Sequence, residues 1–168
     1  MLCAIAKLDS LSTLRLRELQ KEAARFGLEP KPVYGHITLA CYLGDDAAPF
    51  ISACEELLSG IRPFEVRYRE IEVLKATSII VASPEEGGVL SEIHERIAER
   101  FPDELDEWTR PGAWKPHTTL VYKPDADLDA TAGAMRGVFS PFSARIGTVE
   151  FSLVSGSGYE IINRFRLA

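Results

Sequence analysis

The chain is organised around two similar stretches, Gly35-His36-Ile37-Thr38-Leu39 and Pro116-His117-Thr118-Thr119-Leu120. Each has a histidine, a threonine two positions later, and apolar residues after it. Residues two apart in a β-strand lie on one face, so the histidine and threonine of each copy should project together. The alternate positions are mostly apolar. Each stretch is therefore predicted to be a strand that packs on a core with one face and presents a histidine and a threonine on the other.

These residue types suit phosphodiester chemistry. A neutral imidazole accepts a proton near pH 7 and an imidazolium returns one, so His36 and His117 facing one centre would form an acid and base pair. Hydroxyl groups of Thr38 and Thr119 would donate hydrogen bonds to an anionic oxygen. One His-x-Thr triplet arises by chance, and a lone histidine is usually structural. Two copies, each at the head of a predicted strand, indicate a site.

Composition sets the class of protein. The chain has 168 residues, 46% hydrophobic and 26% charged, as expected for one soluble globular unit. Its net charge of -6 argues against binding of long nucleic acids, which depends on lysine and arginine, but not against a small nucleotide or an RNA end. No run is long enough to cross a membrane, and the apolar residues 1–8 are expected to form a strand rather than a signal peptide. We expect a cytoplasmic protein.

The cysteines and the metal-binding residue types give no sign of a cofactor. Cys3, Cys41 and Cys54 fall in apolar segments without zinc-type spacing, and we expect them to be reduced core residues. A metal site on the two motif histidines is an alternative. It is a poor one, because two imidazoles without a suitable cysteine, aspartate or glutamate beside them make a weak zinc set.

Hydrophobic periodicity predicts alternating strands and helices. Helices are expected from Asp9 or Ser10 to about Phe26, from Asp45 or Asp46 to Gly60, over residues 89–101, and near 128–136. Strands are expected at 1–8, in the two histidine stretches, and at 63–74, 77–83, 141–154 and 157–167. A change of phase between Tyr68 and Ile71 predicts a bulge.

A second internal match shows that the chain is duplicated. Residues 63–68 match residues 141–146, and Glu72 and Glu150 follow at the same offset. The order of histidine strand, helix, Pro-Phe strand and partner strand therefore occurs twice. Such a repeat predicts two similar lobes related by a pseudo-twofold axis, with the two histidine strands in equivalent places along one cleft.

Together, the paired motifs, their separation and the internal repeat resemble the two-histidine (2H) phosphoesterase superfamily, which includes 2'-5' RNA ligase and cyclic phosphodiesterase families. The resemblance covers essentially the whole chain. It implies an α+β fold in which residues 1–168 form a single bilobal domain, with two antiparallel sheets, helices on the outside and a central groove. It also implies that His36 and His117 are catalytic, that Thr38 and Thr119 bind phosphate, and that no metal or other cofactor is needed.

The implied activity is metal-independent hydrolysis of a 2',3'-cyclic phosphate, or of a 2'-5' linked nucleotide or RNA end. One histidine would draw a proton from water while the other protonates the leaving ribose oxygen. A non-catalytic module that binds a nucleotide or RNA end, and a weak 2'-5' RNA ligase, are the alternatives. The sequence does not choose between the histidines as base, and it leaves the oligomeric state open.

Four further residues are candidates for substrate binding. Tyr42 shares the strand parity of His36 and should face the groove, whereas Tyr122 has the opposite parity to His117 and should be core. Lys7 either adds positive potential to the groove or is a solvated surface lysine.

Trp114 and Lys115 adjoin the second motif in an irregular stretch, residues 102–116, which also holds Trp108. The stretch is either a substrate-facing flap or a filling of the junction between the lobes. His94, within a predicted helix, is expected to have a surface or structural role.

Overall fold

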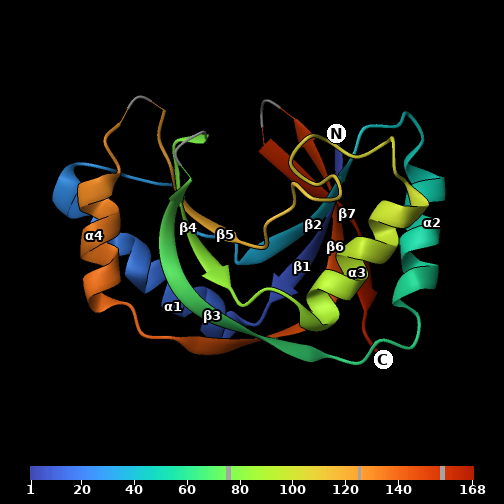
Figure 1. The fold of residues 1–168 in the computed structure, drawn as a ribbon, viewed down its shortest axis with the longest axis horizontal. Helices are drawn as coiled ribbons and strands as arrows, with labels where there is room; N and C mark the ends of the chain where they lie inside the picture. The colour runs from blue at the N-terminus through green and yellow to red at the C-terminus, as the bar shows by residue number, and fades with distance from the viewer. Residues whose placement is uncertain (75–76, 125, 156–157) are drawn as a thin grey trace.

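The computed structural model describes residues 1–74, 77–124, 126–155 and 158–168, and the first residue of the predicted strand at 157–167 lies outside them. Two strand-helix-strand-helix-strand repeats follow each other along the chain (Figure 1). The first comprises β1 (Leu2–Leu8), α1 (Ser10–Gln20), β2 (His36–Tyr42), α2 (Ala47–Leu58) and β3 (Phe64–Leu74). The second comprises β4 (Ile79–Pro84), α3 (Gly88–Arg100), β5 (Thr118–Tyr122), α4 (Asp129–Val138) and β6 (Phe142–Ser155). A 3-10 helix η1 (Lys21–Phe26) extends α1, and β7 (Gly158–Arg166) follows β6.

Local chemistry explains where these helices begin and end. The Asp9 carboxylate accepts the Ser12 N–H at 2.9 Å and caps α1, and Asp46 accepts the Ala48 N–H at 3.0 Å and caps α2, as predicted. Gly27 ends η1 with a left-handed φ of 69°. In the described residues, no helix is both long and apolar enough to span a membrane.

The strands form one antiparallel hydrogen-bonded network in the order β2-β1-β6-β3-β4-β5, with β7 also paired to β6. The two predicted sheets are joined into one network where the first half of β3, residues 64–68, pairs with the first half of β6, residues 142–146. Among the described residues, the two strands do not pair with each other beyond these segments. Beyond these residues β3 pairs with β4, while β6 pairs with β1 and β7. The register of β3 shifts between Tyr68 and Glu70, which confirms the predicted bulge. The strands thus diverge into two lobes.

One helix of each repeat, α1 or α3, is exchanged between the lobes. The His36 lobe consists of β1, β2, β7 and the second half of β6, and it is covered by α2 and α3. The His117 lobe consists of β4, β5 and the second half of β3, and it is covered by α1 and α4 (Figure 1). The first helix of each repeat therefore packs on the histidine strand of the other repeat. One continuous apolar cluster runs through both lobes.

Both histidine strands carry a bulge at the same position of the motif. Thr38 pairs with Ile5 and Ala40 with Ala4, so Leu39 is skipped, and the β4–β5 register skips Leu120 in the same way. An extra residue reverses the faces of everything after it. The strand parity used for the two tyrosines was therefore wrong for both.

Tyr42 is 7% exposed and stacks on Phe50 in the core at a centroid distance of 4.6 Å, so it does not face the groove. Tyr122, expected in the core, is 66% exposed.

The same reversal brings Cys41 opposite Cys3, with 4.2 Å between their Cα atoms, and the two form a disulfide. The expectation of three reduced thiols was wrong for this pair. Cys54 is free, and its burial raises the pKa of its thiol to about 12.

Candidate active site

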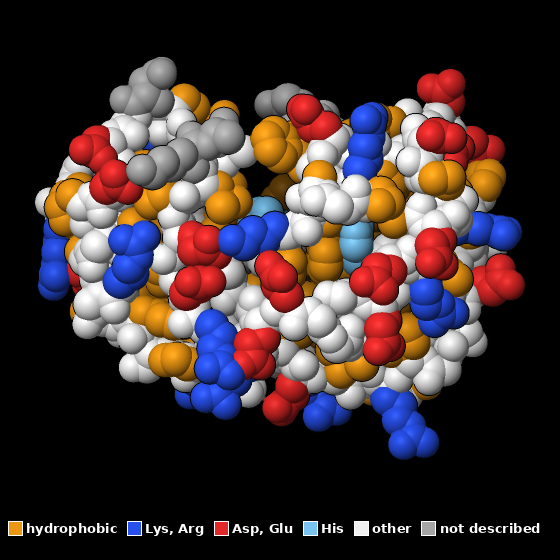
Figure 2. Space-filling view, in the orientation of Figure 1, with side chains coloured by type: hydrophobic (Ala, Val, Ile, Leu, Met, Phe, Trp, Pro, Cys, Tyr) orange, Lys and Arg blue, Asp and Glu red, His pale blue; other side chains and the backbone are white. Residues whose placement is uncertain are grey.

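Two cavities meet at Thr38, one on the His36 lobe and one lined by residues of both lobes, and together we call them the groove. One, of about 350 Å³, is lined by residues that include Tyr34, His36, Thr38 and Tyr159. The other, of about 410 Å³, is lined by residues that include Thr38, Trp108, Trp114, Lys115 and His117. Thr38 belongs to both. The space-filling view shows the molecule hollowed between its lobes (Figure 2). The structure thus brings both predicted histidines to one groove.

A buried threonine ties the two motifs together. Thr118, beside His117, is 1% exposed and donates its hydroxyl to the backbone oxygen of His36 at 2.8 Å. The same hydroxyl lies 2.6 Å from the phenol oxygen of Tyr68, which is fully buried. Thr119, the next residue, is exposed on the other face, as the motif predicted. The first motif is equally constrained, because Gly35 has a left-handed φ of 74° and a Cβ atom there would overlap the Thr13 side chain.

His36 is held in its neutral form. Its Nδ1 atom is buried and has no hydrogen-bond partner among the described residues. Burial lowers the pKa of the imidazole to about 4, helped by the positive charge of Lys7 and by His117 and opposed by Glu150. At neutral pH this side chain is therefore a proton acceptor.

His117 has a defined tautomer. Its Nδ1 atom lies 2.8 Å from the backbone oxygen of Lys115. A carbonyl oxygen only accepts, so Nδ1 carries the hydrogen and Nε2 is left for the groove. Burial lowers the pKa of this imidazole, with the hydrogen bond and Glu72 opposing. Both histidines are thus mainly neutral at pH 7.

Each lobe also holds a glutamate engaged by the residue two positions ahead of its histidine. The Lys115 ammonium lies 2.6 Å from the Glu72 carboxylate. The Tyr34 phenol donates to Glu150 at 2.7 Å, and Arg164 donates to the same carboxylate at 2.8 Å. The Tyr34 ring is 5.9 Å from the His36 ring. The internal repeat had matched the two glutamates, but sequence reasoning did not assign them to the site.

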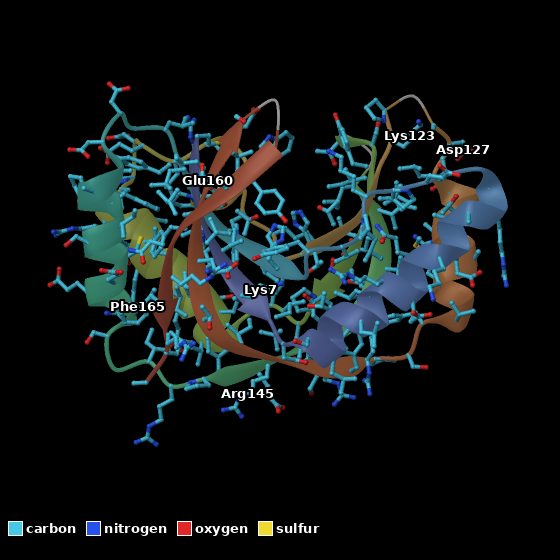
Figure 3. The ribbon with its side chains drawn as sticks, turned by 180° about the vertical axis from the view of Figure 1, so that it is seen from behind. Lys7, Lys123, Asp127, Arg145, Glu160 and Phe165 are labelled. Atoms are coloured by element: carbon cyan, nitrogen blue, oxygen red, sulfur yellow. A yellow bond between two sulfur atoms is a disulfide. The ribbon has the colours of Figure 1, made fainter. Side chains whose placement is uncertain are left out.

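Lys7 is partly buried, and backbone oxygens already accept hydrogen bonds from its ammonium. It lies in the middle of the molecule (Figure 3), and its ammonium donates to the backbone oxygens of Tyr34 and Gly35. It also lies 3.7 Å from the centroid of the Tyr34 ring. Burial lowers the pKa of this lysine. Of the two alternatives for Lys7, the structure favours the one that adds positive potential to the groove, and contact with substrate stays a prediction. Lys7 acts on the groove through its charge and through its hold on the residues before His36.

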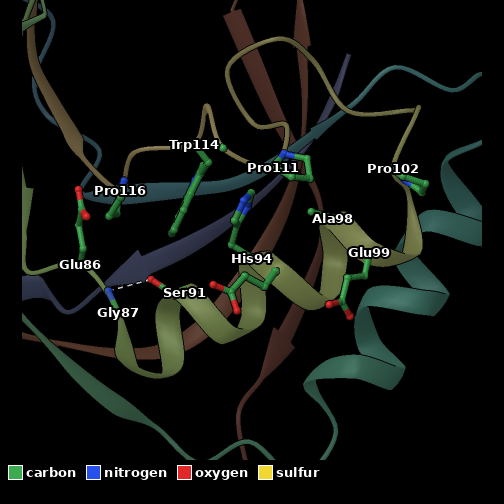
Figure 4. Close-up of a pocket in the computed structure, with 12 residues that line it drawn as sticks. Glu86, Gly87, Ser91, His94, Ala98, Glu99, Pro102, Pro111, Trp114 and Pro116 are labelled. Carbon is green, nitrogen blue, oxygen red and sulfur yellow. Dashed lines mark hydrogen bonds between the residues drawn. The ribbon is translucent and has the colours of Figure 1, made fainter.

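The two tryptophans of residues 102–116 have different roles. Trp108 is 54% exposed and lines the groove, as a substrate-facing flap requires. Trp114 fills the junction, because its indole N–H donates to the Thr38 backbone oxygen at 2.8 Å and its ring stacks on His94 at 4.0 Å. Figure 4 shows this pair at the wall of a separate outer cavity of about 740 Å³.

The structural role expected for His94 is confirmed. The side chain is 4% exposed, and its Nδ1 atom lies 2.9 Å from the backbone oxygen of Leu39, the bulged residue of β2. In the other lobe the Gln20 amide donates to the backbone oxygen of Leu120, the equivalent bulged residue, at 2.6 Å. Each exchanged helix therefore satisfies the carbonyl that the opposite bulge leaves unpaired.

Over the described parts of the chain, no three His, Cys, Asp or Glu side chains gather as a metal site would require.

The bilobal fold and the paired motifs define the class as two-histidine phosphoesterase-like. A family model described as the 2'-5' RNA ligase superfamily matches residues 9–158, and the chain belongs to this family. No curated protein matches the sequence.

Solved structures share the fold. TT0787 of Thermus thermophilus has a TM-score of 0.72 at 21% identity, with 99% of this chain and 97% of that chain covered. LigT of E. coli in its apo form has a TM-score of 0.64 at 16% identity, with 99% and 96% covered. LigT complexed with 3'-AMP has a TM-score of 0.61 at 16% identity, with the same coverage. At these identities the likeness concerns the fold.

Proposed function

We propose that the protein is a metal-independent phosphodiesterase that hydrolyses a 2',3'-cyclic phosphate, or a 2'-5' linked nucleotide or RNA end, in the groove. The observation that carries the proposal is the placement of His36 and His117 in two cavities that meet at Thr38. Two neutral imidazoles beside hydroxyl donors are the groups that in-line displacement at phosphorus needs. The net charge of -6 favours a small substrate over long nucleic acid.

The reaction follows from the charge states of the site. An anionic phosphodiester entering the groove raises the pKa of a nearby imidazole, so one of the two histidines takes up a proton with the substrate. The other stays neutral and removes a proton from the attacking water. The imidazolium protonates the ribose oxygen as its bond to phosphorus breaks. Thr38 and Thr119 hydroxyls donate to the nonbridging oxygens.

Family membership and the named complexes support this ligand class. The matching family model is that of the 2'-5' RNA ligase superfamily, and LigT of E. coli has been crystallised with 3'-AMP and with phosphate. A nucleotide phosphate is therefore the first ligand to test on this chain.

The test is hydrolysis of a panel of 2',3'-cyclic nucleotides and 2'-5' linked dinucleotides across pH, with EDTA present. We expect a bell-shaped profile that EDTA does not change, and a loss of at least about a hundredfold in His36→Ala and in His117→Ala. Turnover that survives in both variants would exclude the paired-histidine mechanism. Tight binding of one compound without turnover by the wild type would favour a binding module.

A further inference from the structure

The two glutamates of the site occupy equivalent registers in the two lobes. Glu150 pairs with Ile5, which pairs with Thr38, so all three lie in one row across β6, β1 and β2. Glu72 pairs with Val81, which pairs with Thr119, in the corresponding row across β3, β4 and β5. Each carboxylate therefore sits two strands from the threonine of its own lobe, about 10 Å at ordinary strand spacing.

The residue two positions before each histidine binds the carboxylate with its side chain. The backbone oxygen of the same residue accepts a hydrogen bond beside that histidine. Lys115 binds Glu72 with its ammonium and accepts the Nδ1 hydrogen of His117 with its backbone oxygen. Tyr34 binds Glu150 with its phenol and accepts the Lys7 ammonium with its backbone oxygen. The arrangement is repeated in both lobes, but the holding group is a cation in one and a neutral phenol in the other.

The charges around the two histidines differ as a result. His36 faces Lys7 from β1, Glu150 from β6, His117 from the other lobe and the neutral Tyr34 of its own segment, with Arg164 of β7 on the same carboxylate. Two cations thus surround one carboxylate in this lobe. His117 faces Lys115 and Glu72, one cation and one carboxylate. Lys31 also lines the cavity beside His36, and Asp106 lines the cavity beside His117. The first environment is therefore net positive, whereas the second carries no net positive charge.

We propose that Glu150 and Glu72 are positioning residues that tune His36 and His117 separately, and that the unequal charges around them make His36 the general base and His117 the general acid. The division of roles rests on the proposed function, whereas the tuning itself does not. A net positive surrounding keeps His36 unprotonated when the phosphate arrives. The charged groups around His117 carry no net positive charge, so His117 is the imidazole that takes up the proton when the phosphate binds.

The tuning is tested by NMR titration of the imidazoles in the free protein, with His94 as an internal reference. In Glu150→Gln we expect the His36 midpoint to fall and the His117 midpoint to stay. Glu72→Gln should do the reverse. Each histidine lies two residues from the threonine of that row, so its carboxylate is about 12 Å away at ordinary strand spacing. Loss of a unit charge at that distance gives about 0.25 pH unit even at a dielectric constant of about 80. Glu65→Gln, at an exposed position earlier on β3, is the matched control and should move neither midpoint.

The sign of the change separates tuning from loosening. Burial is the largest cause of the low pKa of His36, so a variant that merely admitted water would raise the midpoint. Lys7→Arg keeps the cation and should leave the His36 midpoint close to that of the wild type, so it shows whether a rise comes from lost charge or from the disturbed contacts with Tyr34 and Gly35. Lys7→Met removes the opposing cation and should raise the His36 midpoint while leaving His117 unchanged. Lys7→Met can still test the inference if Glu150→Gln fails to fold. A rise in Glu150→Gln, equal movement of both midpoints in either glutamine variant, or no rise in Lys7→Met would overturn the inference.

The roles are tested by the pH profile of kcat/KM. A base must be unprotonated, so lowering its pKa in Glu150→Gln moves the acidic limb to lower pH. An acid must be protonated, so lowering its pKa in Glu72→Gln moves the alkaline limb to lower pH. The opposite assignment of limbs would refute the division of roles. A wild type that turns over nothing would count against the proposed function alone, because the NMR midpoints are measured without substrate.

Discussion

Thr118 and Thr119 are neighbours with the same side chain, and the structure gives them opposite tasks. Thr118 is buried and bridges the Tyr68 phenol and the His36 backbone oxygen, whereas Thr119 is exposed in the second motif. Replacing Thr118 by valine exchanges a hydroxyl for a methyl group of similar size. The change removes two hydrogen bonds and leaves no large cavity.

The expected cost follows from those two bonds. A typical internal hydrogen bond contributes about 0.5 to 1.5 kcal/mol net, and a buried partner left unsatisfied costs about 1 to 3 kcal/mol. Tyr68 is fully buried, so its phenol finds no water. We therefore expect Thr118→Val to lower the free energy of unfolding by about 2 to 4 kcal/mol. Thr119→Val should change it by less than about 0.5 kcal/mol.

Urea denaturation followed by circular dichroism measures both effects. Tyr68→Phe provides the second arm of a double-mutant cycle, since Thr118→Val should cost less once the phenol is gone. We expect a coupling of about 1 to 2 kcal/mol. The effect on catalysis should be larger for Thr119→Val than for Thr118→Val. Thr119→Val should lose at least about tenfold in kcat/KM, because the hydroxyl that donates to the phosphate is missing. Equal stability of the two valine variants would refute the bridge between the motifs.

Three further predictions concern pH, the Trp114 bond and the disulfide. The pKa of His36 is about 4 in the folded protein against 6.5 ordinarily, so the unfolded chain binds more protons between these values. Stability should fall by up to about 3 kcal/mol as pH drops through this range, and His36→Asn should flatten the fall in urea titrations at pH 7 and 4.5. Trp114→Phe keeps the ring but loses the donor to Thr38, and steady-state kinetics should show KM raised by about 3- to 10-fold. Reducing the Cys3–Cys41 disulfide, which spans 38 residues, should lower the free energy of unfolding by about 4 kcal/mol in urea titrations with and without a phosphine reductant.

Strand parity predicted the groove residues only as far as each bulge. His36 and Thr38, before the bulge, lie where the alternation placed them, while Tyr42, after it, does not. A bulge is a property of a strand pair. It depends on which residue of β1 or β4 stands opposite, and that register is set by contacts distant in sequence. The same limit explains why Cys3 and Cys41 were not recognised as partners.

The internal repeat was more informative than any single motif. It placed the two histidines in equivalent positions and matched Glu72 with Glu150 before any contact was known. It could not show that Lys115 and Tyr34 hold these carboxylates, because the two partners differ in type and the repeat aligns only what is alike.

The exchange of α1 and α3 makes each repeat depend on the other. The bulged carbonyl of Leu39 depends on His94 of the second repeat, and that of Leu120 depends on Gln20 of the first. A single repeat would therefore lack the helix whose side chain satisfies the bulged carbonyl of its own histidine strand. One repeat on its own would satisfy both bulged carbonyls only as a dimer with exchanged helices, in which two identical histidines lie across the symmetry axis.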